Sequence, residues 1–103
     1  MENNSKTAPP PQVQPVMGEG ETWRNTTGAV LFASDHGLEW HLRDREFRAE
    51  LLQQGLIFRI RQKYVTTDPA GLYAAIVSQM RRRSQQHATR EAAYRAAREQ
   101  PSA

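Results

Sequence analysis

Three cations at alternate positions are the clearest group of side chains that could bind a charged partner. Arg59, Arg61 and Lys63 lie in the segment 56–65, LIFRIRQKYV. Alternate side chains share one face of an extended strand, so these three would form a row of positive charge. Such a row suits a surface that meets carboxylates or phosphates, although a solvated outer face carries the same pattern. Both interpretations stay open from the sequence.

A second basic group lies near the C-terminus, where residues 81–99 hold six arginines and two glutamates. Guanidinium groups bind phosphate oxygens through paired hydrogen bonds. The alternative function predicted here is therefore nucleic-acid binding, with phosphates contacted by the strand cations and by Arg81, Arg82, Arg83, Arg90, Arg95 and Arg98. The same segment could instead be a solvent-exposed helical extension, or a helix that packs on another chain through Tyr94.

Catalytic chemistry finds little support in the residue types present. The chain has no cysteine, and Ser34, Asp35 and His36 are adjacent, so their side chains diverge and cannot form a triad locally. His36, His41 and His87 lack the spacing and the thiol partners of a compact metal site. The sequence predicts a non-enzymatic protein with no cofactor, metal or small-molecule substrate.

Length and composition predict one small domain. The chain has 103 residues and a net charge of +3, with the basic excess increasing toward the C-terminus. No apolar run is long enough to cross a bilayer, and the first residues lack the apolar core of a signal peptide. We expect a virion or cytoplasmic location, without secretion or membrane association.

Composition divides the chain into three parts. Residues 1–22 are rich in proline and predict an arm that is either flexible or docked on a neighbouring subunit, with Val13, Val16 and Met17 as its apolar anchors. Residues 23–80 predict an α+β body, and residues 81–103 predict a basic helical extension and tail.

The predicted order of elements in the body is ββαβα. A hairpin over residues 21–34 turns at Asn25–Gly28. A helix then covers residues 39–54, a strand covers 56–65, and the last helix begins at Pro69. The strand should turn Leu56, Phe58, Ile60 and Tyr64 toward the core, and Ile57 and Val65 outward beside the three cations.

Local signals predict where the helices begin and end. Ser34 or Asp35 suits the cap of the first helix, and Gly55 suits its left-handed terminus. Asp68 followed by Pro69 is a typical start for the last helix.

The body is too small to be strongly stable alone. A domain of about 60 residues buries only about 60% of its unfolded surface, and domains of this size are often stabilised by disulfides, metals or oligomerisation. Because the chain offers no disulfide, we expect partner subunits, including further copies of the chain. The predicted function is that of a structural or interaction protein in a larger assembly.

Two short motifs carry a family resemblance. Residues 23–30, WRNTTGAV, and residues 48–56, RAELLQQGL, resemble small virion proteins of tailed bacteriophages, especially those that infect actinobacteria. The resemblance spans about a third of the chain and ends at Leu56. It implies a minor capsid, decoration or head–tail accessory protein.

Overall fold

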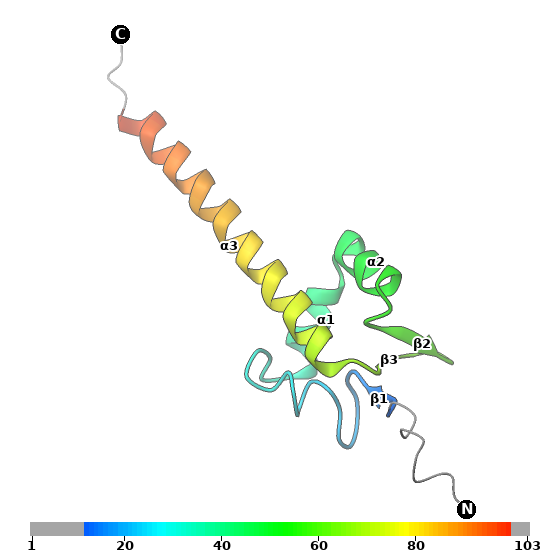
Figure 1. The fold of residues 1–103 in the computed structure, drawn as a ribbon. Coiled ribbons are helices and arrows are strands. Elements are labelled where there is room, and N and C mark those ends of the chain that lie inside the picture. The colour runs from blue at the N-terminus through cyan, green and yellow to red at the C-terminus, as the bar shows by residue number, and fades with distance from the viewer. Residues whose placement is uncertain (1–11, 100–103) are drawn as a thin grey trace, which may run out of the picture. The chain divides into compact units, whose positions relative to one another are not determined.

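The computed structural model describes residues 12–99, so expectations for residues 1–11 and 100–103 lie outside the described residues. Figure 1 shows the elements in chain order, β1 (Gln14–Pro15), α1 (Asp35–Leu42), α2 (Arg45–Gln53), β2 (Phe58–Ile60), β3 (Lys63–Thr66) and α3 (Pro69–Glu99). The predicted α+β class and the long C-terminal helix are confirmed. The order within the fold is βααββα, and the predicted ββαβα order is wrong.

The chain divides into two units, one that ends at Tyr73 and one that begins at Ala74. This division falls inside α3, as does the predicted boundary after residue 80. The first unit contains the sheet, α1, α2 and the first turn of α3. The second unit contains the rest of α3.

The segment predicted as one strand is a β-hairpin. Ile60 pairs with Lys63, which leaves Arg61 and Gln62 as a two-residue turn between β2 and β3. Arg61 has a φ of 60°, and this left-handed conformation reverses the chain. Two-residue hairpin turns need positive φ and are favoured by glycine or asparagine, so the sequence carries no signal for this turn.

The sheet has the order β1-β3-β2, and both pairs are antiparallel. Residues directly opposite one another share a face. We call the face of Pro15, Phe58, Ile60, Lys63 and Val65 the outer sheet face. The opposite, inner sheet face carries Gln14, Arg59, Tyr64 and Thr66.

The turn changes which residues of the segment face the core. Ile57 and Val65 were expected outside, yet both are buried. Ile60 was expected inside, yet it is 44% exposed. The predicted alternation assumed one continuous strand, whereas the reversal at the turn places Ile60 beside Lys63 on the outer sheet face.

The N-terminal segment belongs to the body from residue 14 onward, which corrects the predicted arm over residues 1–22. β1 pairs with β3, and the backbone N–H of Val16 donates to the carbonyl oxygen of Tyr64 at 3.0 Å. Val16 is 1% exposed. The body therefore includes a third strand that comes from the proline-rich part of the sequence.

The predicted hairpin over residues 21–34 is wrong, because the chain winds into helical turns. The N–H of Thr22 donates to Asn25 Oδ1 at 2.9 Å, and the N–H of Asn25 donates to Thr22 Oγ1 at 3.2 Å. These reciprocal bonds favour a turn over an extended strand. Trp23 is fully buried above Gly28, where an added Cβ would lie 2.7 Å from Cε3 of the indole.

The helix predicted over residues 39–54 is two helices. Ser34 caps α1, as predicted, by accepting a hydrogen bond from the N–H of Gly37. The extended residue Asp44 then interrupts the helical path and caps α2, accepting from the N–H groups of Glu46 at 3.0 Å and Phe47 at 3.2 Å. Gly55 adopts the predicted left-handed conformation, with a φ of 73°.

The start of α3 agrees with its predicted cap. The N–H of Gly71 donates to Asp68 Oδ1 at 3.0 Å, and the helix begins at Pro69. The Trp23 indole N–H donates to the carbonyl oxygen of Pro69 at 3.0 Å, which joins the early turns to this helix start. The buried apolar side chains of the first unit are Val16, Trp23, Phe32, Leu38, Leu42, Phe47, Leu51, Ile57, Val65 and Leu72.

Candidate interaction surfaces

An apolar groove with a basic rim lies on the outer sheet face. It joins β1 to the hairpin, and we call it the outer groove. Val13 and Ile60 are 49% and 44% exposed, while Val65 beneath them is buried. The lining residues are Val13, Pro15, Ile60, Arg61, Gln62, Lys63 and Val65. The outer groove therefore combines exposed apolar side chains with two cations.

The predicted row of three cations is divided by the hairpin. Lys63 lies on the outer sheet face and Arg61 lies in the turn. Arg59 belongs to the inner sheet face, where its guanidinium carbon lies 5.7 Å from the ring centroid of Tyr64. The structure brings Arg61 and Lys63 together in the outer groove but places Arg59 on the other side of the sheet.

A second groove, which we call the helix-side groove, lies between the hairpin and the junction of α1 with α2. Its basic members are Arg43, Arg48 and Lys63, and Glu39 is its acidic member. Met17, Leu42, Gln62 and Tyr64 complete its lining. Arg48 Nη1 donates to the carbonyl oxygen of Leu42 at 3.1 Å, which fixes this arginine at the helix junction.

An ion pair fixes the N-terminal segment to α1. Arg24 Nε lies 3.0 Å from Asp35 Oδ1, and Arg24 Nη1 donates to the carbonyl oxygen of Phe32 at 3.2 Å. Asp35 Oδ2 accepts from the N–H of Gly18 at 3.1 Å. A largely buried Arg24 that satisfies two partners holds the segment after β1 against α1.

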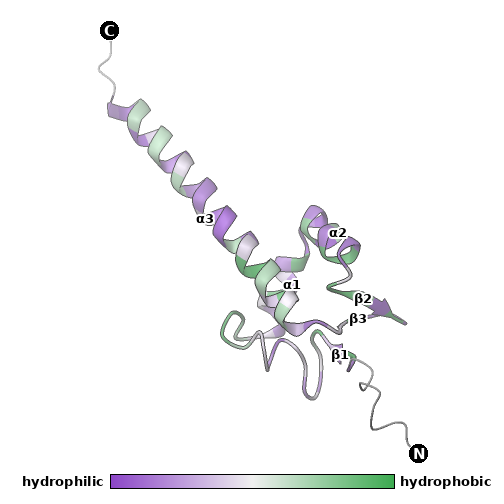
Figure 2. Ribbon diagram, in the orientation of Figure 1, coloured by the Kyte–Doolittle hydropathy of each residue, from purple (hydrophilic) through white to green (hydrophobic). Residues whose placement is uncertain are grey.

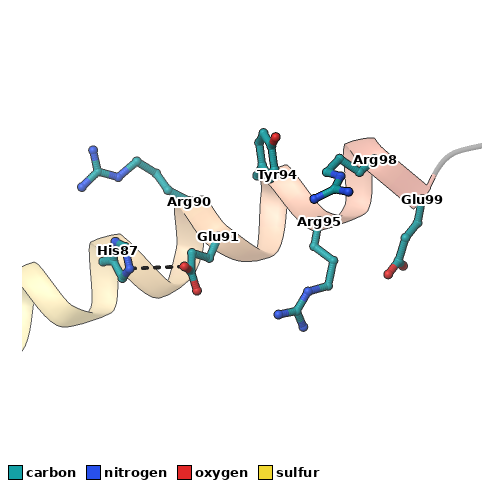
Figure 3. A pocket seen from close by; sticks show the side chains of 7 residues that line it. All are labelled: His87, Arg90, Glu91, Tyr94, Arg95, Arg98 and Glu99. Atoms are coloured by element: carbon teal, nitrogen blue, oxygen red, sulfur yellow. Dashed lines mark ion pairs between the residues drawn. The ribbon is translucent and has the colours of Figure 1, made fainter.

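The second unit presents a basic helix. Residues 81–99 are exposed along their whole length, and Figure 2 shows a mainly hydrophilic stretch in the middle of α3. His87 Nε2 lies 3.4 Å from Glu91 Oε2. Figure 3 shows Arg90 and Arg95 pointing to opposite sides of the helix. The six predicted arginines of this segment thus surround α3, since a helix turns about 100° per residue.

The predicted anchors have three different environments. Val13 is half-exposed in the outer groove, Met17 is half-buried in the helix-side groove, and Val16 is buried in the core. Val16 is therefore unavailable to a partner in the folded chain. Tyr94 is 66% exposed on α3, with the guanidinium carbon of Arg98 5.7 Å from its ring centroid.

Sequence reasoning missed several lining residues. The prediction places Ile60 on the core face because the sequence gives no signal for the turn, and it places Pro15 in an arm. Arg43 and Arg48 are not among the predicted binding residues, because the prediction has one continuous helix over residues 39–54. The signal that could have identified them is Asp44, a good cap residue in the middle of the predicted helix.

Among residues 12–99, no three histidine, aspartate or glutamate side chains cluster as metal ligands. Within the same described range, no helix is both long and apolar enough to cross a membrane. Comparison with protein-family models, with curated proteins and with solved structures finds no match.

Proposed function

We propose that the protein is a non-enzymatic subunit of a larger assembly, and that it binds a second copy of itself through the outer groove. The observation that carries this proposal is the pairing of two half-exposed aliphatic side chains with two cations. The resemblance to small virion proteins extends the proposal to a capsid, decoration or head–tail accessory role in a phage particle. The proposed location is then the virion, or the cytoplasm before assembly.

The lining of the outer groove suits binding. Burial of apolar surface contributes about 25 cal/mol per Å², so covering Val13 and Ile60 would contribute on the order of 1 kcal/mol for each side chain. Arg61 and Lys63 at the rim favour a partner that carries carboxylates. All seven lining side chains are aliphatic, basic or amide groups, which suit apolar contact and charge pairing with a partner.

A second copy of the chain offers the complementary charge. Glu19 and Glu21 are exposed in the loop that follows β1. These carboxylates can meet Arg61 and Lys63 of another subunit, whose aliphatic groups would be covered in the same contact. Rim charges of this kind set orientation and salt dependence more than total affinity.

Light scattering combined with gel filtration, from about 1 to 300 µM, tests the proposal. We expect mass to rise with concentration, and Ile60→Asp to weaken the association by about tenfold or more, since it places a charge in the apolar contact. Val30→Asp is the matched control, because Val30 is 78% exposed outside the groove. A monomer at every concentration, or equal effects of the two variants, would contradict self-association through this groove.

A further inference from the structure

The junction of α1 and α2 forms a compact helix–turn–helix. The helices have eight and nine residues, and only Arg43 and Asp44 separate them. A pair of short helices joined by a tight turn is the unit with which many proteins place the second helix in the DNA major groove. The connection here is shorter than the three or four residues typical of that unit.

One side of α2 packs in the core, and the other side is exposed. Phe47 and Leu51 are buried, and the Phe47 ring centroid lies 5.7 Å from that of His41 on α1. At helical spacing, the opposite side carries Arg45, Glu46, Ala49, Leu52 and Gln53, all of which are exposed. Ala49 lies at the centre of this side, where a small side chain permits close approach of another surface.

The exposed side of α2 itself carries one basic and one acidic side chain, Arg45 and Glu46. Positive charge lies beside it in the helix-side groove, which has three basic side chains and one acidic side chain. The helix-side groove brings Arg43 and Arg48 of the helix junction together with Lys63 of the hairpin. The hairpin therefore extends the basic surface beyond α2, as required for contacts to a phosphate backbone that flanks the groove.

We propose that the first unit binds duplex DNA, with α2 in the major groove and the hairpin against the adjacent phosphates. An α-helix with its side chains is about 10–12 Å across and fits a major groove about 12 Å wide, and the nine residues of α2 span about 14 Å along its axis. Arg45 and Gln53 have side chains that pair with guanine and adenine edges, while Arg43 and Lys63 serve as phosphate contacts. This role goes beyond the proposed self-association, and the two surfaces share Lys63 of the hairpin.

DNA fits this surface better than double-stranded RNA. The major groove of A-form RNA is deep and narrow, so a helix cannot reach its base edges. α3 is also a poor candidate for reading bases, since its arginines point to several sides. An exposed arginine helix of this kind would add sequence-independent attraction to phosphates.

Fluorescence anisotropy of the full chain with a labelled 30-base-pair DNA duplex, between 50 and 300 mM KCl, tests the proposal. Affinity should fall steeply with salt, with a slope near −0.9 for each neutralised phosphate. Ala49→Glu should reduce affinity by about thirtyfold or more, because it places a carboxylate where α2 meets the groove. Lys63→Ala should reduce the magnitude of the slope by about 0.9.

Matched variants separate this surface from general charge effects. Ala29→Glu makes the same change at an exposed position outside α1, α2 and the hairpin, and should alter affinity by less than about threefold. Gln53→Glu provides a second variant on the exposed side of α2 if Ala49→Glu fails to fold. The proposal is overturned by absence of binding at 50 mM KCl, by equal loss in Ala29→Glu, or by equal affinity for an RNA duplex. It is also overturned if affinity falls in Arg90→Ala, Arg95→Ala and Arg98→Ala but not in the α2 variants.

Discussion

At the scale of the residue, Arg61 is the least expected feature of the fold. It adopts a positive φ in a turn that glycine would enter without strain. A left-handed conformation costs a non-glycine residue about 1–2 kcal/mol. The strain places a guanidinium group at the rim of the outer groove, where the proposed partner contributes carboxylates. Strained backbone of this kind often accompanies binding sites.

Arg61→Gly should therefore stabilise the monomer and weaken its association. We expect the free energy of unfolding to rise by about 0.5–1 kcal/mol, because the relief of strain exceeds the extra chain entropy of glycine. Urea denaturation at low protein concentration measures the first effect, and light scattering measures the second. Arg61→Lys is the control, since it keeps both charge and strain. A less stable glycine variant would show that the turn is not strained.

At the scale of the element, the helix termini could be predicted and the strands could not. Ser34, Gly55 and Asp68 end or begin helices through hydrogen bonds or dihedral angles within a few residues. Because these interactions are local, the neighbouring sequence is sufficient to predict them. β1 depends on pairing with β3, some fifty residues later. Nothing local in a proline-rich segment indicates such a partner.

The same contrast explains how much of the candidate site was foreseen. Arg61, Lys63 and Val13 were identified as binding residues from charge and hydropathy, and all three line the outer groove. Their grouping was not foreseen, because it requires the unsignalled turn at Arg61 and the non-local strand β1. The helix-side groove was missed because Asp44 divides a sequence whose apolar residues suggest one continuous helix.

Asp44 should determine the integrity of the α1–α2 junction. Asp44→Ala removes the acceptor for two N–H groups of α2, so we expect the free energy of unfolding to fall by about 1 kcal/mol. Asp44→Ser should recover most of this loss, because serine is also a good cap. Urea denaturation of the three proteins measures the difference. An alanine variant as stable as the parent would show that the cap contributes little to the junction.

At the scale of the whole molecule, the two proposals share part of the hairpin but differ in the surface beside it. Lys63 and Gln62 line both grooves, so the hairpin turn is shared. Ile60 and Ala49 are not shared, since one belongs to the outer groove and the other to the exposed side of α2. Ile60→Asp should therefore reduce association in the light-scattering experiment, while Ala49→Glu should leave it intact.

The second unit should open locally more easily than α1 and α2 of the first unit. Residues 81–99 are exposed on every side of α3, so their helix depends on intrinsic propensity and on local pairs such as His87 with Glu91. Most helical stability in proteins comes from tertiary packing of an apolar face rather than from intrinsic propensity. We expect hydrogen exchange to show protection of only about 10- to 100-fold for amides 84–99, whereas the amides of α1 and α2 approach the protection of global unfolding.

A concentration series then identifies the surface that associates. If copies meet through the outer groove, raising the protein concentration should slow exchange in β1, β2 and β3 and leave amides 84–99 unchanged. Ile60→Asp should abolish that slowing, since it removes the apolar contact without touching α3. Protection that instead rises in residues 84–99 would show that α3 pairs with another helix, and self-association through the outer groove would then be incorrect.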